Sequence, residues 1–513
     1  MPPRSVPAEL RQMVNSLQGA YDTGPTIVTG DVVKDIGLSS GMQPYDLAPY
    51  VTFLFPTFSP LRNKLPRWVR QGKNFQNKAV TNPDTNNVSG IATEGTLAAA
   101  IATQFADVTA YYKSYGVSSD PVTYEQIYAG EGKRGDFSVD SRSLAIAQLL
   151  KAMFIKEERL LWFAQGSTTQ VILVNNAPVN GLTYTIGGGV GTAPAPTLTQ
   201  SATGGTVAAN TYYFSLVAIG SMAVPLGMPT NAGKLPFTAA MTGTSLPTLL
   251  ANVPSVTTAG ATSTITVTIP VYQGQCPIIG WLIFGGLAAD PTTHHYQGST
   301  NGASFTLTAT PSTAAAAPPV ADTTSNNGAF NSVASYIWAI NSGSTIKNIN
   351  GALTSADQVN GMFIDLWENA QADPDTLYTS GSDMPAFTKV SIGSGSPYFV
   401  TYKGGAEMGD AIGNYRVSRW INPVTSKILP INVHAYMPQG SAYALTEQLP
   451  AWYVGNDVPS VFAWVGAMDY LQVDYAPTPA TTKFLSEIRC FGAPFCFLPS
   501  QHGVLAGMTK PVS

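Results

Sequence analysis

Charged side chains are scarce in this chain, and the shortage is local. They make up 11% of its 513 residues, whereas ordinary soluble domains carry about 25%. Between Leu160 and Ile346 the only formal charges are Lys234, Asp290 and Asp322. So sharp a change in composition predicts a separate domain whose surface is hydrated by hydroxyls and amides. The net charge of −4 argues against a general nucleic-acid binder, because such domains carry a strong basic excess.

Cysteine and histidine, which serve as nucleophiles and metal ligands in many protein sites, are also rare. The cysteines are Cys276, Cys490 and Cys496, and the histidines are His294, His295, His434 and His502. Three cysteines without zinc-site spacing predict neither a disulfide framework nor a structural zinc site, so we expect buried thiols. Adjacent side chains on a strand point to opposite faces, so we expect His294 and His295 on a loop or sheet surface rather than on a metal.

Catalytic and cofactor-binding motifs are missing from the sequence. It contains no HExxH pair and no GxxxxGK[ST] phosphate loop. The triple glycine Gly187–Gly189 lacks the helix start that would bind phosphate, and we interpret it as a flexible hinge. Glu157 and Glu158 stand beside Lys156 and Arg159 on a predicted helix, and we interpret them as a solvated or interface face rather than an acid–base pair. The sequence therefore predicts no enzymatic activity, no cofactor and no metal site.

Long hydrophobic runs are absent as well. The longest, Cys276 to Ala289, is broken by glycines and is too short to span a bilayer. The stretch from Met1 to Ala20 has no apolar run of the signal-peptide type. We therefore expect a protein that is neither embedded in a membrane nor exported by the usual route.

What the chain does contain is apolar and turn-forming. Hydrophobic residues make up 44% of it, and it has 48 glycines and 38 prolines, so it folds, with turns and strands favoured over long helices. In the charge-poor segment, short strand-like runs separated by turn residues predict an antiparallel sandwich. These runs lie at Thr211–Ile219, Thr262–Val271, Ile278–Phe284 and Ser304–Thr310. The flanks at 187–196 and 314–319 are typical of linkers, which favours a sandwich inserted into another domain.

Outside that segment the pattern predicts an α+β scaffold. An amphipathic arm over Pro7–Gln18 places Leu10, Met13 and Leu17 on one face, and we expect residues 74–115 to form a long polar hairpin or loop. The longest expected helix covers Ser141–Ala164. A second helix, Ser355–Ala372, begins at a capping-box-like Thr354 and Asp357 and stops before Pro374. Later strands are expected at 398–402, 415–421, 429–436 and 483–491.

One charge pattern requires a partner. From Leu47 to Pro83 the chain has no acidic residue and six basic ones, which are Arg62, Lys64, Arg67, Arg70, Lys73 and Lys78. Charges of one sign this close together repel one another unless something negative meets them. Three interpretations stay open: a solvated loop, pairing with acidic groups of a neighbouring subunit, and contact with nucleic-acid phosphates, although no aromatic residues of the base-stacking sort are interleaved with the charges.

The same region carries a resemblance. Residues 55–67 read FPTFSPLRNKLPR, which resembles the TPLRNxLPR segment of the major capsid proteins of tailed bacteriophages, of the Hong Kong 97-type fold. Ala145–Arg159 is similar to the spine helix of that family. Tyr415–Pro423 and Leu429–His434 are similar to its later axial-domain strands. The matches are collinear and cover most of residues 45–165 and 330–510.

The resemblance implies a Hong Kong 97-type capsid fold with an inserted, all-β sandwich of the fibronectin type III or immunoglobulin-like kind. Residues 1–50 would be the N-terminal arm, 51–116 the extended-loop region, 117–190 the peripheral domain with its spine helix, 191–325 the inserted sandwich, and 326–513 the axial domain and the return to the peripheral domain. The subunit-interface residues would be Leu10, Met13 and Leu17 of the arm together with the six basic residues. Some relatives cross-link subunits through a Lys–Asn bond; Lys73 and Lys78 lie in the corresponding loop, but the partner asparagine and the assisting glutamate find no match.

The function that the resemblance implies is self-assembly into an icosahedral head shell around the viral genome. The expected partners are copies of the chain itself as pentamers and hexamers, scaffolding and portal proteins, and double-stranded DNA held by weak, non-specific contact, with a cementing protein left open and no membrane. The family's N-terminal scaffolding extension finds no match here, which implies either a separate scaffolding protein or the prior removal of such a segment. The protein would reside in the virion after assembly in the host cytoplasm.

A rival hypothesis is a tail or fibre adhesin whose sandwich binds host-surface glycans. In that case exposed aromatics such as Tyr272, Trp281 and Tyr296 would stack on sugars, although core packing is the commoner role for a tryptophan such as Trp281. Uniform particles in electron micrographs would favour the shell, and fibres that retain glycan affinity would favour the adhesin.

Overall fold

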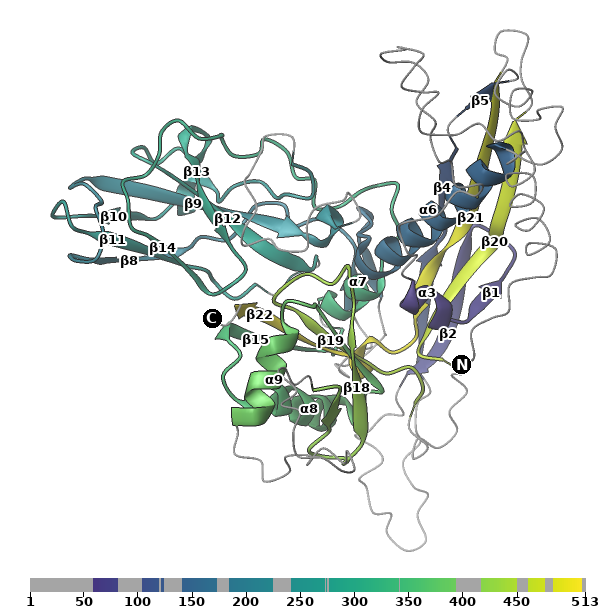
Figure 1. Ribbon diagram of the computed structural model, residues 1–513. Coiled ribbons are helices and arrows are strands. Elements are labelled where there is room, and N and C mark those ends of the chain that lie inside the picture. The colour runs from purple at the N-terminus through teal and green to yellow at the C-terminus, as the bar shows by residue number, and fades with distance from the viewer. Residues whose placement is uncertain are drawn as a thin grey trace, which may run out of the picture. The chain divides into compact units, whose positions relative to one another are not determined.

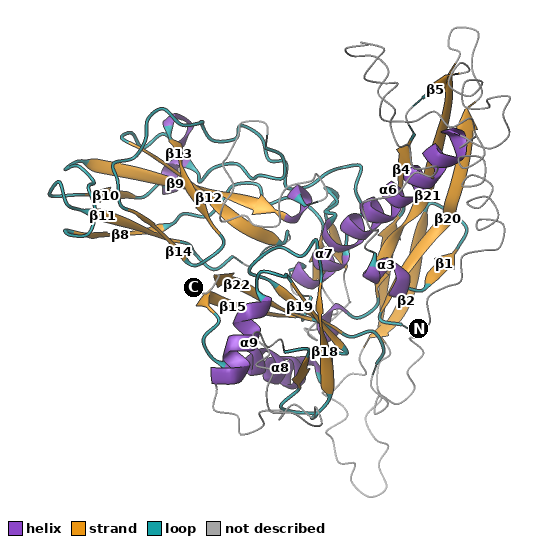
Figure 2. Cartoon of the chain, viewed as in Figure 1, coloured by secondary structure: helices purple, strands orange, loops and turns teal. Residues whose placement is uncertain are grey.

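The computed structural model describes residues 59–81, 104–119, 121–123, 141–172, 184–224, 241–272, 274, 276–340, 342–393, 417–449, 460–475 and 483–509 (Figures 1 and 2). These residues divide into two compact units. The first holds the described parts of Gly116–Met153 and Gln472–Arg489, and the second holds the remainder. The expected arm with Leu10, Met13 and Leu17 lies outside the described residues, as do the tip of the hairpin at 82–103 and the strand expected at 398–402.

The first unit is built around the start of a long strand, β21 (Lys483–Cys496). A two-residue strand, β5 (Val122–Thr123), pairs antiparallel with it. Ser119 N donates to Ser486 O at 2.7 Å, and Ser486 N donates to Ser119 Oγ at 3.0 Å. The close approach of Gly116 is possible only without a side chain, because a Cβ there would lie 2.5 Å from Ile488 O.

The expected long helix is confirmed as α6 (Ser141–Phe163). In the second unit it is accompanied by a short helix, α3 (Pro60–Lys64), and by strands β1 (Arg67–Val69), β4 (Lys113–Ser118) and β20 (Phe462–Tyr475). The strand order is β1-β20-β21-β4, with β1 parallel to β20 and Arg67 opposite Trp464. The α3–β1 segment, where the basic run begins, is thus part of the folded scaffold.

The expected polar hairpin is also confirmed in its described part. Strands β2 (Asn74–Thr81) and β3 (Gln104–Tyr111) pair antiparallel from Asn74–Tyr111 to Thr81–Gln104. They form a two-stranded ribbon, and within the described chain neither strand pairs with a third. At its root, Phe75 packs edge to face on Phe495 with ring centroids 5.0 Å apart. A two-stranded ribbon of this kind is marginally stable by itself in water.

A mixed six-stranded sheet forms the centre of the region after residue 330. Its strands, in sheet order, are β15 (Thr345–Ala352), β22 (Gly503–Thr509), β19 (Ala442–Leu445), β16 (Thr376–Thr379), β18 (Ile428–Val433) and β17 (Arg419–Ile421). Helices α7 (Val333–Trp338), α8 (Ala356–Ala370) and α9 (Met384–Gly393) accompany it. Val359, Met362, Phe363 and Leu366 of α8 are fully buried and pack in one core with Leu429 of the sheet.

The second expected helix is confirmed, but its cap differs by one residue. Ser355, rather than Thr354, is the N-cap, and Gln358 closes the capping box. Ser355 is in the extended conformation that an N-cap adopts. The backbone N–H of Thr354 donates to the Gln358 side chain at 2.8 Å. Because both candidates carry a hydroxyl, only the backbone geometry selects between them.

The charge-poor segment forms two antiparallel sheets around one apolar core. One sheet has the order β10 (Ser255–Thr257), β9 (Thr211–Gly220), β12 (Ile278–Gly286), β13 (His295–Thr300), and the other has the order β14 (Ser304–Leu307), β11 (Thr264–Thr268), β8 (Thr197–Ser201). Phe214 and Ile283 of the first sheet pack with Ile265 and Val267 of the second, and all four are fully buried. A small sheet of β6 (Gln170–Ile172) and β7 (Tyr184–Ile186) precedes it.

The glycine run before these sheets is a fixed turn, so the expectation of a flexible hinge was wrong. Gly187 and Gly191 have φ values of 85° and 70°, which glycine alone adopts without strain. Gly191 N donates to Asp322 Oδ2 at 2.8 Å, and a Cβ on Gly187 would lie 2.3 Å from Thr168 O. Such hydrogen bonds join the segment that enters the two sheets to the segment that leaves them, and they hold the turn in place. Amino-acid composition does not reveal contacts of this kind.

The alanine-rich flank at 314–319 is likewise ordered. His295 Nδ1 donates to Ala315 O at 2.7 Å, and Tyr296 N donates to Ala316 O at 3.0 Å. This flank therefore covers the edge strand β13, whose backbone groups would otherwise be open to another chain.

None of the described helices is long and apolar enough to cross a membrane.

Candidate functional site

The root of the ribbon is held by a buried carboxylate of helix α6. Glu157 is fully buried, and its Oε1 accepts from Arg67 Nη1 at 2.9 Å and from Tyr115 Oη at 2.7 Å. Its Oε2 accepts from Arg62 Nε at 3.2 Å and from Tyr470 Oη. Arg67 precedes the ribbon and Tyr115 follows it, so one carboxylate fixes both ends of the chain that forms the ribbon.

The neighbouring carboxylate fixes the helix that precedes β1. Glu158 is also fully buried; it accepts from Leu61 N at 3.0 Å and from Arg62 N at 2.9 Å, in the first turn of α3. His434 Nε2 lies 2.7 Å from Glu158 Oε1. Because Tyr436 N donates to His434 Nδ1 at 3.2 Å, Nδ1 is an acceptor and the proton on Nε2 faces the carboxylate.

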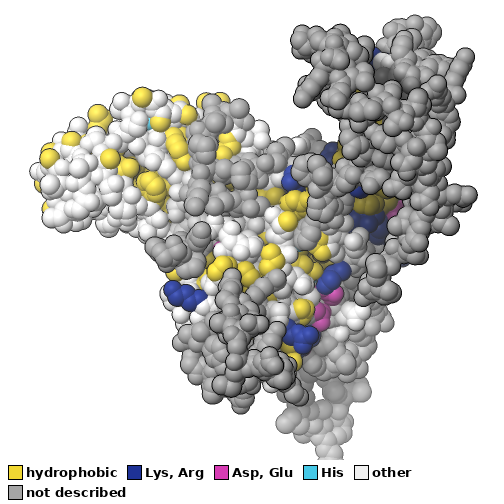
Figure 3. Space-filling model, in the orientation of Figure 1, with side chains coloured by type: hydrophobic (Ala, Val, Ile, Leu, Met, Phe, Trp, Pro, Cys, Tyr) yellow, Lys and Arg dark blue, Asp and Glu magenta, His cyan; other side chains and the backbone are white. Residues whose placement is uncertain are grey.

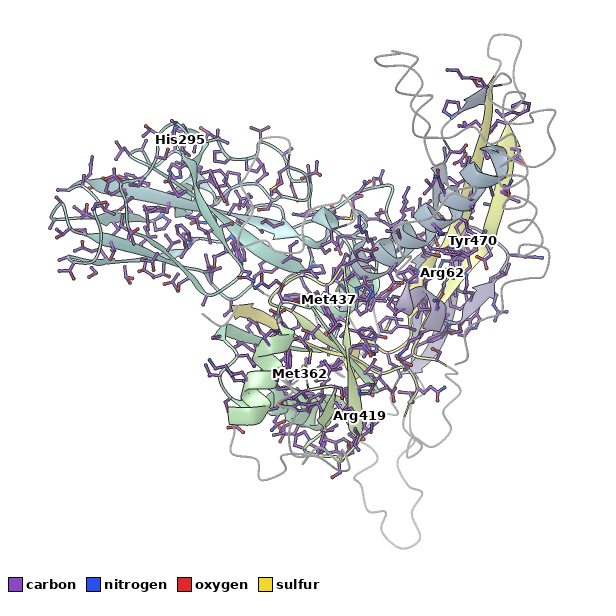
Figure 4. The ribbon with its side chains drawn as sticks, viewed as in Figure 1. Arg62, His295, Met362, Arg419, Met437 and Tyr470 are labelled. Carbon is purple, nitrogen blue, oxygen red and sulfur yellow. The ribbon has the colours of Figure 1, made fainter. Side chains whose placement is uncertain are left out.

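Aromatic rings complete the surroundings of the two arginines. The Arg62 guanidinium lies 4.0 Å from the centre of the Phe154 ring, and that of Arg67 lies 4.1 Å from Trp464; Figure 4 shows Arg62 and Tyr470 beside α6. Arg67 also pairs with Asp469 at 2.6 Å. Burial opposes the charge on Arg67, but the carboxylates of Asp469 and Glu157 outweigh it and raise the pKa of the guanidinium. Such cation–π contacts strengthen as water is excluded.

Two other side chains in this cluster are kept neutral. Burial and the adjacent Glu157 raise the pKa of the Tyr115 hydroxyl well above its usual value, and burial raises the pKa of the Cys490 thiol to about 12. Trp464 Nε1 donates to Tyr115 Oη at 2.9 Å. The hydroxyl and thiol therefore act as hydrogen-bonding groups rather than as nucleophiles at neutral pH.

The expectation that Glu157 and Glu158 form a solvated or interface face was wrong. Both are buried because cations, backbone amides and a histidine from distant segments meet them, and these partners compensate the loss of water. The spacing of residues in a helix shows which of them share a face. Charged residues interrupt the apolar spacing in the same way whether they are buried in ion pairs or exposed to water, so the sequence does not distinguish the two cases. The sequence did carry one signal of this pairing. A basic run without acidic residues and the acidic pair Glu157–Glu158 both lie in the stretch 45–165 that resembles capsid proteins.

Three of the six basic residues are paired with acidic groups of the same chain. Arg62 and Arg67 are paired with Glu157, and Lys64 pairs with Glu447 at 2.7 Å on the surface. Arg70 and Lys73 are exposed, while Lys78 lies on β2 with its side chain outside the described residues. Arg62, Lys64 and Arg67 contact acidic groups of the same chain. None of the three open interpretations had included such partners. The interface assignment stays a prediction for all six.

The cysteines and histidines occupy buried positions. The three cysteines are free and buried, as predicted. His294 lies in the loop between Thr293 and β13, as one of the two expectations had it, but it is fully buried, with Nδ1 2.9 Å from Ser215 Oγ and Nε2 2.9 Å from Ala288 O. His502 is buried against Phe462, with ring centroids 4.4 Å apart, and burial lowers the pKa of His502 to about 3. The described residues contain no group of three or more His, Cys, Asp or Glu that could hold a metal.

The two-sheet segment shows a surface almost without charge. Figure 3 shows hydrophobic and uncharged polar side chains over it on the face in view. Of the aromatics weighed for sugar stacking, Trp281 is 7% exposed and belongs to the core. Tyr272 packs edge to face on Trp281, and Tyr296 on Phe284. Trp281 thus belongs to the core, and Tyr272 and Tyr296 are half-buried.

Comparison with known proteins gives the following. No protein-family model matches the chain, and no curated protein matches it. Among solved structures, the capsid asymmetric unit of cyanophage A-1(L) is 11% identical, with a TM-score of 0.42, covering 91% of this chain and 98% of that one. The capsid of a native GTA particle is 10% identical, with a TM-score of 0.40, covering 94% of this chain and 99% of that one. The capsid of cyanophage P-SCSP1u is 8% identical, with a TM-score of 0.37, covering 92% and 94%.

Proposed function

We propose that this chain is a major capsid protein of the Hong Kong 97 type that self-assembles into the icosahedral head shell of a tailed bacteriophage. The support for this comes from the chain's own residues. The proposal includes a structural, non-enzymatic role and a location in the virion.

The observation that carries the proposal is the β2–β3 ribbon. Both ends of the ribbon are fixed by Glu157, yet within the described chain the ribbon pairs with no third strand. Tyr111 at its end is 48% exposed, and Val69 just before it is 61% exposed. The ribbon is marginally stable by itself and carries exposed apolar groups at its base. This supports a role in which a neighbouring copy packs against the ribbon and stabilises it.

The interface assignment follows from the same geometry. Arg70 and Lys73 stand at the ribbon root and are exposed, whereas the charges of Arg62, Lys64 and Arg67 are met within the chain. We therefore assign Arg70 and Lys73 to direct contact with acidic groups of a neighbour. Arg62 and Arg67 then act indirectly, by orienting the ribbon.

The five-part division remains part of the proposal: arm 1–50, extended-loop region 51–116, peripheral domain 117–190, insertion 191–325 and axial domain 326–513. We interpret the insertion as immunoglobulin-like because its described residues form seven strands in two packed sheets. Its strand order differs from that of the constant immunoglobulin domain, because here the four-stranded sheet takes the second, third, fifth and sixth strands of the segment, whereas there it takes the first, second, fourth and fifth. Scaffolding and portal proteins and packaged DNA are proposed as further partners.

Electron microscopy of the purified full-length chain tests the function. Closed particles of uniform size are expected, and a monomer or fibres that bind glycans would contradict the proposal. The charge-reversed variant Arg70→Glu with Lys73→Glu should lower particle yield at least tenfold while leaving the thermal unfolding of the free subunit unchanged. The charge-preserving variant Arg70→Lys with Lys73→Arg is the matched control and should assemble.

A further inference from the structure

The outer face of the hairpin β17–β18 carries exposed aliphatic side chains. Along these strands burial alternates, so that Trp420, Leu429 and Ile431 point into the core while Ile421 and Ile428 point outward. Ile421 and Ile428 stand directly opposite each other and are 61% and 55% exposed. Among the strands that the structure describes, β17 is also the edge of this sheet. Apolar pairs at an exposed edge attract further protein.

A cation adjoins this apolar pair. Arg419 lies two residues before Ile421 on the same face of β17, opposite Pro430, and its position is labelled in Figure 4. It is exposed and forms no ion pair with any residue that the structure describes. The face defined by Arg419, Ile421 and Ile428, here called the hairpin face, is thus apolar with a positive edge.

Helix α8 presents an outward stripe of the opposite charge. Asp357, Gly361, Ile364 and Glu368 follow a spacing of four, three and four residues, which places them on one side of the helix. Ile364 is 40% exposed, and Asp357 and Glu368 are exposed. Lys347 lies beside this stripe but is paired with Asp365 at 2.7 Å. The helix face, defined by Asp357, Ile364 and Glu368, is therefore apolar at its centre and acidic at both ends.

Both faces are turned away from one shared core. The buried side of α8, which includes the Met362 labelled in Figure 4, shares one core with the inward residues of β17 and β18. Trp420 Nε1 also donates to Asn360 Oδ1 of α8 at 3.1 Å. Because the inward residues of α8 and of the hairpin share this core, the hairpin face and the helix face are both turned away from it. Complementary patches that are turned away from a shared core do not meet each other within one chain, but they can meet between copies arranged head to tail, and such contacts form a ring when the rotation from copy to copy closes.

We propose that the hairpin face of one copy docks on the helix face of the next, with Ile421 and Ile428 against Ile364 and with Arg419 facing Glu368. This contact rests on the proposed shell function and deepens it by naming the two surfaces that join subunits within a ring. Lys347 and Asp365, which lie beside the helix face, neutralise each other. The negative charge of this face therefore comes from Asp357 and Glu368.

A charge swap tests the docking. Arg419→Glu and Glu368→Arg should each lower the yield of closed particles at least tenfold, and the double variant should recover most of the wild-type yield. Lys389→Glu, at an exposed position of α9 outside both faces, is the control and should assemble normally. Singles that assemble like wild type, a double variant no better than the singles, or an equal loss with Lys389→Glu would each overturn the docking.

A cross-linking experiment keeps the docking testable if a charge variant misfolds. The double variant Ile364→Cys with Ile421→Cys, treated with copper phenanthroline as oxidant, should give a ladder of disulfide-linked oligomers beyond the dimer on a non-reducing gel. Each single variant should stop at the dimer, and absence of a ladder in the double variant would contradict the contact. A wild-type chain that forms no particles would contradict the capsid function instead, and wild-type particles with indifferent variants would contradict only the docking.

Discussion

Glu157 Oε1 accepts hydrogen bonds from Arg67 Nη1 at 2.9 Å and from Tyr115 Oη at 2.7 Å. These two donors lie on opposite sides of the ribbon in the sequence, and the acceptor belongs to a helix further along the chain. A fully buried carboxylate is tolerated here because Arg62, Tyr470 and the two donors together satisfy both of its oxygens. Glu157 therefore joins the segments before and after the ribbon through one side chain.

Glu157→Ala should consequently lower the free energy of unfolding by about 3–5 kcal/mol, because it leaves two arginines partly unpaired in a buried site. Urea unfolding followed by tryptophan fluorescence measures the change. Lys64→Ala removes the surface pair with Glu447, whose two side chains are each 41% exposed, and should cost less than about 1 kcal/mol. Equal losses for the two variants would contradict the role given to Glu157.

Asp383→Asn should stabilise the protein above pH 6. Asp383 is 2% exposed, and burial, opposed by hydrogen bonds from Ser380 and Gly440, raises the pKa of its carboxyl from 3.8 to about 6. A folded-state pKa above the unfolded value means that stability is greatest below pH 4 and is lost as the pH rises through 6. The amide avoids this loss, which amounts to at most about 3 kcal/mol. Melting temperatures of both proteins between pH 4 and pH 8 would test this, and parallel curves would refute it.

The sandwich should lose stability in acid because of His294. Burial lowers the pKa of His294 below its ordinary 6.5, so the unfolded chain binds a proton that the folded chain refuses. The stability contributed by neutral His294 is present above pH 6.5 and declines as the pH falls below it. His294→Gln keeps the donor to Ala288 O and should flatten the dependence of melting temperature on pH between 7 and 5. A dependence on pH that His294→Gln leaves unchanged would contradict this role for His294.

Gly187→Ala should destabilise the junction of the sandwich by about 1–3 kcal/mol, because a residue with φ of 85° is strained by any side chain. The added Cβ would also meet Thr168 O at 2.3 Å. Gly260→Ala serves as the control, since a Cβ there meets nothing within 4 Å. Differential scanning calorimetry of both variants distinguishes a fixed turn from a flexible hinge, for which the two substitutions would be equally mild.

Local patterns predicted much of the secondary structure. The spacing of Leu149, Met153 and Leu161 marked the long helix that the structure shows as α6, and the alternation near Val267 marked β11. The roles of Glu157, Glu158 and His434 could not be predicted in this way. Their partners lie 42 to 313 residues away, and a carboxylate on a helix has the same local pattern whether water or an arginine faces it.

Apolar spacing and composition act over a few residues, and they were enough to predict helices α6 and α8, the hairpin β2–β3 and the charge-poor segment. They did not predict helices α7 and α9 or strands β15 and β22. The folded chain shows in addition that part of the basic run meets acids of its own chain, that the glycine run is a fixed turn, and that hairpin β17–β18 and helix α8 carry complementary faces turned away from their shared core. Those outcomes depend on which distant groups share a buried space, where an unpaired charge costs several kcal/mol, and no local pattern records that.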